Sequence, residues 1–147
     1  MTTIAATKTQ IAGDRQANHN GGLKFKIPTK LASFYSPIIY KVPFHVGLCG
    51  NIEDFPEVWD FFRDPTTHKK SPSLRKGEGL VLSEDGKLWT FSNASNWFRI
   101  GQDYYAIGSE MNFAMGAMAD GATAYDAVKI TAKLDPNTGM GVTKIDI

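Results

Sequence analysis

With 147 residues and a formal net charge of +1, the chain is long enough to bury a hydrophobic core and has no charge excess that would draw it to nucleic acid or an anionic membrane. Its single cysteine, Cys49, excludes an internal disulfide, and no apolar run approaches the roughly 20 residues that a membrane helix needs. Because the N-terminus also lacks the basic and apolar blocks of a secretory signal, we expect one domain spanning residues 1–147 in the cytoplasm.

The first third of the chain consists of short segments with β-strand character. Residues 3–6 and 10–13 predict two strands joined by a turn at residues 7–9, which contains no glycine. Residues 14–22 are polar and predict a loop. Further apolar segments predict strands at residues 25–27, 31–35, 38–42 and 44–48. Pro43 has no backbone N–H to donate to a ladder, so we expect it at a sheet edge or a bulge.

After Gly50 the spacing of apolar residues changes from two to about 3.6, which is typical of a helix. Phe55, Val58, Trp59 and Phe62 share one helical face, and Asp64-Pro65 is expected to end the helix. Residues 66–79 are basic and contain no interleaved aromatic residues. This composition favours a solvated loop over a phosphate-binding surface.

Strands and helices alternate in the second half of the chain. Asp85-Gly86 suits a type I′ turn and predicts a hairpin between residues 80–82 and 87–91. Further strands are expected at residues 97–100, 104–107 and 141–147.

Two helices are expected between the last two strands. Ser109 is the predicted cap of the first, which ends near Asp120 with Gly121 as its stop. Thr123, with Asp126 three residues on, opens the second, which ends near Asp135 because a proline follows. The chain has no internal repeat.

Thr2 carries the most distinctive chemistry. If Met1 is removed, the freed α-amine lies on the same residue as the Thr2 hydroxyl, so the nucleophile carries its own base. An α-amine titrates at about 7.7 to 8.0, and a fraction is therefore neutral near pH 7. Because Met-Thr-Thr also opens unrelated chains, Thr2 becomes a candidate nucleophile only together with other residues.

Cys49 and His45 suggest a thiol nucleophile as an alternative. Residues four apart on a strand lie far from each other, and a small cysteine at a strand end is typical of packing. We therefore place the nucleophile at Thr2.

Six short motifs occur along the chain. They are Thr2-Thr3-Ile4, Ile11-Ala12-Gly13-Asp14, Ile27-Pro28-Thr29-Lys30-Leu31, Val46-Gly47-Leu48-Cys49-Gly50, Ala106-Ile107-Gly108-Ser109 and Asp135-Pro136-Asn137-Thr138-Gly139. In this order they resemble the proteasome β-subunit family and its bacterial relative, the HslV peptidase, over essentially the whole chain. The resemblance implies an α+β fold, the αββα four-layer sandwich of N-terminal nucleophile (Ntn) hydrolases, in which two packed antiparallel sheets are flanked by helices.

The resemblance also implies a role for each matched residue. Thr2 supplies the nucleophile and the base, and the ammonium of Lys30 lowers the proton affinity of both groups. Asp14 pairs with Lys30 and holds it in place. The N–H of Gly50 stabilises the tetrahedral oxyanion, a contribution of roughly 3 to 4 kcal/mol for one donor in other hydrolases.

The remaining implied residues orient the amine or bind substrate. Those that orient the amine are Ser109, Asp135 and Thr138. Those that line an apolar substrate pocket are Ala17, Pro28, Ala32, Leu48 and Ile52. Neither a cofactor nor a metal is expected. Taken one at a time, the motifs also fit ordinary roles as a surface ion pair, a helix cap and a turn.

The chain departs from the family in three places. Its first hairpin is shorter and lacks the glycine turn. The segment from Phe34 to His45 carries extra residues and prolines. Only one helix is predicted between Gly50 and the next hairpin, where the family has two, so one helical layer is expected to be reduced.

These observations lead to three functional hypotheses. The first is a threonine endopeptidase that acts on peptides or unfolded proteins. It is expected to form a self-compartmentalising homo-oligomer of one ring or stacked rings and to receive substrates from an ATP-driven unfoldase. No nucleic-acid or membrane partner is expected. The second is a catalytically idle assembly or binding module with the same fold. The third is a small-molecule amidohydrolase that uses the same Thr2 chemistry.

Overall fold

The computed structural model describes residues 2–18, 23–36 and 40–147. The strands are β1 (Thr3–Thr7), β2 (Gln10–Asp14), β3 (Gln16–Asn18), β4 (Lys24–Lys26), β5 (Leu31–Ser36), β6 (Tyr40–Cys49), β7 (Glu78–Ser83), β8 (Leu88–Phe91), β9 (Phe98–Ile100), β10 (Tyr104–Gly108) and β11 (Val142–Asp146). The helices are α1 (Phe55–Arg63), α2 (Met111–Ala119) and α3 (Ala124–Leu134), with short 3-10 turns η1 (Ile52–Asp54) and η2 (Pro65–Thr67). None of these helices, within the described residues, is long and apolar enough to span a bilayer.

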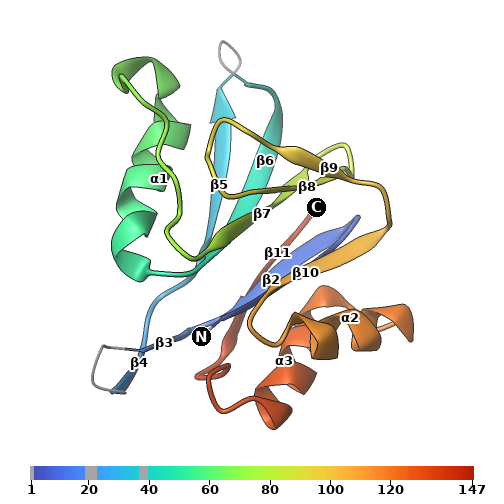
Figure 1. The fold of residues 1–147 in the computed structure, drawn as a ribbon. Coiled ribbons are helices and arrows are strands. Elements are labelled where there is room, and N and C mark those ends of the chain that lie inside the picture. Colours follow the sequence, from blue (N-terminus) through green and yellow to red (C-terminus); the bar gives the residue numbers. More distant parts are fainter. Residues whose placement is uncertain (1, 19–22, 37–39) are drawn as a thin grey trace.

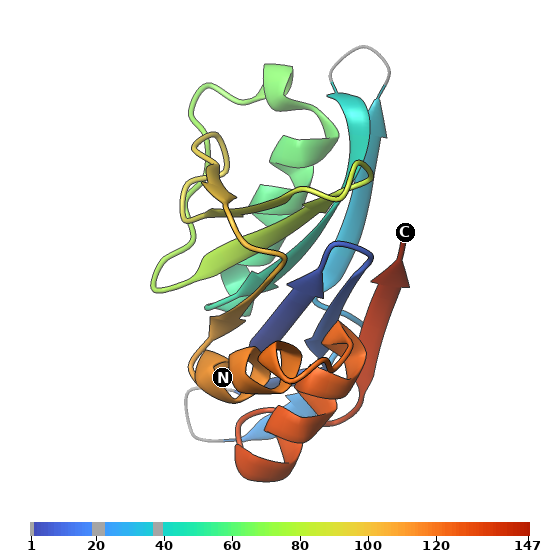
Figure 2. The ribbon, with the colours of Figure 1, turned by 90° about the vertical axis from the view of Figure 1, so that its right-hand side faces the viewer.

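The strands and helices form four layers. One sheet has the strand order β10-β1-β2-β11 and the other β5-β6-β7-β8-β9, both antiparallel. Figures 1 and 2 show α1 outside the five-stranded sheet and the α2–α3 pair outside the four-stranded sheet. This arrangement confirms the expected α+β sandwich, including the reduced layer, since α1 is the only α-helix of the described chain on its side.

A core of aliphatic side chains lies between the two sheets. It combines Ile4, Ile11 and Ile107 of the four-stranded sheet with Leu80, Leu82 and Leu88 of the other. These residues are at most 2% exposed. Because β1 and β2 contribute to this core, the segment that begins at Thr2 is fixed to the centre of the molecule.

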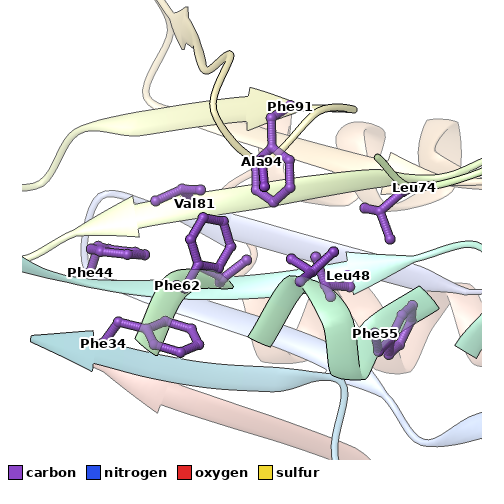
Figure 3. Packing of buried hydrophobic residues seen from close by; sticks show 11 residues of the cluster. Phe34, Phe44, Leu48, Phe55, Phe62, Leu74, Val81, Phe91 and Ala94 are labelled. Carbon is purple, nitrogen blue, oxygen red and sulfur yellow. The ribbon is translucent and has the colours of Figure 1, made fainter. Parts of the chain in front are cut away.

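Aromatic side chains fill the space between α1 and the five-stranded sheet. Figure 3 shows Phe62 of α1 among sheet residues, and its ring centroid lies 5.3 Å from that of Phe34, 5.6 Å from Phe44 and 5.5 Å from Phe91. Large aromatic surfaces contribute much burial per residue. One short helix therefore covers the middle of this sheet.

Small residues allow α2 and α3 to pack closely on the four-stranded sheet. Ala5, Ala12 and Ala106 face Ala114 and Ala127 in a cluster where each of these alanines is fully buried. Helix α3 begins as expected, because the Thr123 side chain accepts a hydrogen bond from the Asp126 N–H at 3.1 Å.

The first hairpin forms without a glycine turn. Thr7 Oγ1 accepts a hydrogen bond from the Thr9 N–H at 3.3 Å, so a threonine side chain pairs with a backbone N–H of the turn. The hairpin of β7 and β8 uses the expected glycine, with Gly86 at a φ of 80°, but Asp85 has no positive φ, so the predicted type I′ turn is wrong.

Pro43 lies at a bulge, as one of its two expected positions allows. Strand β6 lies between β5 and β7, so the edge alternative is wrong. Phe34 pairs with Phe44, but Ser36 pairs with Tyr40, so the register shifts in the part of β6 that contains Pro43. The Pro43 carbonyl still accepts a hydrogen bond from the Glu84 N–H at 2.9 Å.

Two expectations need correction. The predicted loop 14–22 contains β3, which pairs with β4, while residues 19–22 lie outside the described part. Ser109 does not cap α2, because Glu110 occupies the position before its first residue and makes no side-chain cap hydrogen bond. Of the predicted strand 38–42, residues 38 and 39 also lie outside the described part.

Candidate active site

Thr2 lies directly before β1 and is 5% exposed. Strand pairing brings the next residue, Thr3, opposite Gly108 at the end of β10. A Cβ on Gly108 would lie 1.8 Å from the Thr2 carbonyl oxygen, and the φ of 114° at Gly108 is strained for other residues. The absence of a side chain at Gly108 therefore allows the Thr2 backbone to lie against the end of β10.

The Lys30 ammonium lies against the Thr2 hydroxyl. Its Nζ donates to Thr2 Oγ1 at 2.6 Å, to Asp14 Oδ1 at 2.9 Å and to the Gln16 carbonyl at 2.6 Å. These three acceptors match the three N–H donors of an ammonium. Since Thr2 Oγ1 accepts from Lys30, its own proton remains available for another acceptor.

Burial governs the protonation of Lys30. The side chains of Lys30 and Asp14 are both 0% exposed. Loss of hydration lowers the pKa of Lys30 below its ordinary value, and the Asp14 carboxylate, by its charge and its hydrogen bond, offsets part of this effect.

Asp14 is held by four donors. Its Oδ1 accepts from the Thr3 N–H at 3.1 Å and from Lys30, and its Oδ2 accepts from the Gln16 N–H at 3.3 Å and the Gly139 N–H at 3.2 Å. Both carboxylate oxygens thus accept hydrogen bonds, from donors on four different segments. The arrangement stabilises the negative charge that faces Lys30.

Asp135 and Thr138 reach the same region from the turn after α3. Thr138 Oγ1 donates to Asp135 Oδ2 at 2.7 Å and lies 3.0 Å from Thr3 Oγ1. Both residues are under 5% exposed. The structure thus brings this pair to the residue after Thr2, and the Gly139 N–H connects the same turn to Asp14.

Beside Thr2 opens a cavity of about 410 Å³. Its lining consists of Thr2, Cys49, Gly50, Lys76, Gly77, Glu78, Ser92, Gly108 and Ser109. Gly50, with a φ of 118°, packs against the next loop, because a Cβ on Gly77 would lie 2.9 Å from the Gly50 Cα. Both Gly50 and Ser109, predicted from their motifs, therefore line the same space as Thr2.

The five residues expected to line a substrate pocket do not line this cavity. Leu48 is fully buried in the aromatic core under α1, and Ala32 and Ile52 pack against that core. Ala17 is buried in β3, whereas Pro28 is exposed. Three of the five expected residues, Ala32, Leu48 and Ile52, are thus used for packing around the aromatic core and do not line the cavity beside Thr2.

Several residues that position or surround Thr2 were not singled out from the sequence. Gln16 contributes only its backbone to Lys30 and Asp14, which no side-chain pattern signals. Lys76, Gly77 and Glu78 belong to a segment predicted as a solvated loop. Gly77, just before β7, was the available signal that this segment lies against another backbone, since a glycine permits such a close approach.

The thiol alternative does not fit the structure. Burial is the largest cause that raises the pKa of Cys49, to about 11, so the thiol stays protonated near neutral pH. His45 is engaged elsewhere, with Nδ1 2.7 Å from Ser33 Oγ and Nε2 2.8 Å from Glu84 Oε1.

Comparisons with known proteins give likenesses at the level of structure. No protein-family model and no curated protein matches the chain. Eukaryotic HslV from Trypanosoma brucei gives a TM-score of 0.67 at 18% identity, covering 99% of both chains. BPH from Thiobacillus denitrificans in complex with epoxomicin gives 0.65 at 17%, covering 99% of this chain and 97% of that one. The helical assembly of the Anbu complex from Pseudomonas aeruginosa gives 0.72 at 12%, covering 99% and 80%. The chain thus has the fold of HslV and the proteasome-like Ntn hydrolases.

Proposed function

We propose that this chain, once Met1 is removed, is a threonine-type endopeptidase with Thr2 as its nucleophile. The observation that carries the proposal is the 2.6 Å hydrogen bond from the fully buried Lys30 Nζ to Thr2 Oγ1, which borders the cavity. A cation at this distance favours ionisation of the hydroxyl. The fold shared with HslV, and with BPH that binds epoxomicin, supports the assignment.

In the first half-reaction the Thr2 α-amine accepts the hydroxyl proton while Oγ1 attacks the carbonyl carbon of a peptide bond. The carbonyl electron pair moves to oxygen, where the Gly50 N–H stabilises the negative charge. The tetrahedral intermediate then collapses, the C–N bond breaks, and the leaving amine takes the proton from the Thr2 α-ammonium. The product is an ester on Thr2 Oγ1.

In the second half-reaction a water molecule attacks the ester carbonyl. The Thr2 α-amine accepts the proton of that water, and the second tetrahedral intermediate expels Thr2 Oγ1, which regains a proton from the α-ammonium. The Lys30 ammonium keeps the proton affinity of the α-amine low, so the base is neutral at working pH. Asp14 holds Lys30, and Ser109, Asp135 and Thr138 orient the amine.

The decisive experiment is reaction with a peptide epoxyketone, which forms bonds to both Oγ and the free amine of an N-terminal threonine. Intact-mass spectrometry of the purified protein first establishes whether Met1 is absent. We expect one covalent adduct on Met1-free protein, none on Thr2→Ala, and an unchanged adduct on the control variant Thr9→Ala at the tip of the first hairpin. Met1-free protein that forms no adduct would refute the proposal.

The peptidase is proposed to act in a homo-oligomer, with peptides or unfolded proteins as substrates delivered by an ATP-driven unfoldase. The helical assembly of the Anbu complex supports self-association for this fold. Light scattering of the purified protein gives the subunit number. A monomer at micromolar concentration would contradict the oligomer and leave the Thr2 chemistry to be tested separately.

A small-molecule amidohydrolase is the second candidate. The cavity of about 410 Å³ falls in the range of small-ligand sites. Hydrolysis of short acyl amides, without cleavage of a denatured protein, would favour this alternative. Protein that retains Met1 quantitatively, and whose Thr2→Ala variant assembles and binds as wild type does, would instead favour an idle assembly or binding module.

A further inference from the structure

Most of the side chains that line the cavity beside Thr2 belong to polar residues. Among its lining residues, Cys49 is the one apolar side chain, and the others are glycines, hydroxyl residues, Lys76 and Glu78. An apolar substrate side chain would therefore meet no aliphatic or aromatic wall here. The cavity suits a polar or charged group.

Glu78 is the fixed charge of this wall. It begins β7 and pairs with Cys49 of β6, so the sheet holds its backbone, and the residue is half-buried. Within the described chain its carboxylate has neither a hydrogen bond nor an ion pair. Its charge acts on another lining residue of the cavity, because the Glu78 carboxylate adds to the effect of burial in raising the pKa of Cys49.

Lys76, the other charged lining residue, is placed differently. It is exposed, and its φ of 53° belongs to a loop that runs over Gly50. Within the described residues it too has no ion pair. An exposed ammonium is screened by water, whereas a half-buried carboxylate interacts more strongly with a bound opposite charge.

The loop that carries these charges is anchored to the segment after Gly50. The Arg75 N–H donates to Asp54 Oδ2 at 3.1 Å, and the Arg75 guanidinium donates to Asp54 Oδ1 from Nε at 3.1 Å and from Nη2 at 2.9 Å. Gly77 then packs on Gly50. These contacts hold the backbone that leads into Glu78 against the segment around Gly50.

We propose that Glu78 forms a subsite for a cationic substrate side chain, so that the chain cleaves next to lysine or arginine. This inference rests on the proposed peptidase function and adds its substrate class. The substrate ammonium or guanidinium would make a charge-assisted hydrogen bond with the carboxylate. Lys76 on the same wall weakens this attraction, and removing its charge is expected to strengthen it.

The test compares peptides that carry lysine or its uncharged analogue norleucine on either side of the cleaved bond. For wild-type, Met1-free protein we expect kcat/KM to be roughly tenfold to hundredfold higher for lysine, the range of a hydrogen bond to a charged group. Glu78→Gln should remove most of this ratio, and Lys76→Met should increase it. Glu57→Gln, an exposed carboxylate on α1, serves as the matched control and should leave the ratio as in wild type.

A binding arm makes the test independent of turnover. The same peptides are titrated by calorimetry into Thr2→Ala protein, with and without Glu78→Gln, and the lysine peptide should bind roughly tenfold or more tightly only when Glu78 is present. Equal affinities and equal rates for lysine and norleucine would overturn the subsite, as would a preference for glutamate. Preferential binding without cleavage or epoxyketone adduct would retain the subsite and reject the peptidase.

Discussion

Substitution of Gly108 by alanine tests directly whether backbone packing places Thr2. The new Cβ would lie 1.8 Å from the Thr2 carbonyl oxygen, whereas ordinary contact begins at 3.4 Å, so the two atoms must separate by about 1.6 Å. The obstacle is backbone, which cannot rotate away as a side chain would. Since Thr3 pairs with Gly108, the shift is expected to open the start of β1 and carry Thr2 Oγ1 away from Lys30.

The magnitude follows from this displacement. A misplacement of about 1 Å in an active site costs on the order of a hundredfold in rate, so Gly108→Ala should lose at least about a hundredfold in kcat/KM and react far more slowly with the epoxyketone. The positive φ adds a strain of roughly 1 to 2 kcal/mol, which the control Gly121→Ala shares. Gly121 has a φ of 98° and nothing within 4 Å of its Cβ position. Equal adduct rates and equal melting temperatures for the two variants would refute the steric account.

Three further predictions concern Lys30 and Cys49. Lys30→Met leaves the buried Asp14 charge without its partner, so urea denaturation should show a free energy of unfolding lower by about 3 to 5 kcal/mol. Adding Asp14→Asn should recover part of this loss. A free energy of unfolding equal to that of wild type would contradict the buried pair. Because burial lowers the pKa of Lys30 from 10.5, kcat should begin to fall with rising pH before pH 10.5 is reached. Between the lowered pKa of the folded protein and 10.5, the unfolded chain binds the Lys30 proton more tightly than the folded protein does. The contribution of Lys30 to the free energy of unfolding should therefore rise with pH in this range. Constant kcat up to pH 10.5 would exclude the ammonium from the reaction. Cys49, with its pKa raised to about 11, should resist iodoacetamide at pH 8 until the chain is denatured, and rapid labelling of native protein would contradict its burial.

Local sequence patterns predicted the elements that depend on local chemistry. Asp85-Gly86 indicated the hairpin because Gly86 can take the positive φ that the turn needs, although Asp85 does not share it and the turn is not the predicted type I′. Thr123 specified the start of α3 because its side chain caps the first turn. Strand β3 was missed, since Gln16, Ala17 and Asn18 have low β propensity and form a strand only through pairing with β4.

The candidate site was predictable in part. The order of the motifs indicated Thr2, Asp14 and Lys30, and the structure brings the Thr2 and Asp14 side chains within hydrogen-bond distance of Lys30 Nζ. The cavity wall was not foreseen, because a basic loop does not reveal which strand end it will cross. Leu48 shows the converse: the resemblance to the family implied substrate contact, whereas its side chain points into the aromatic core.

The distribution of tryptophan has a consequence for experiments on this molecule. All three tryptophans, Trp59, Trp89 and Trp97, pack against the aromatic core under α1, and the sheet that carries Thr2 has none. Tryptophan fluorescence therefore reports on one side of the sandwich and does not detect an early loosening of the other. A denaturation curve followed by emission alone would register the collapse of the aromatic side, and a second probe on the Thr2 side is needed to tell whether both sides melt together.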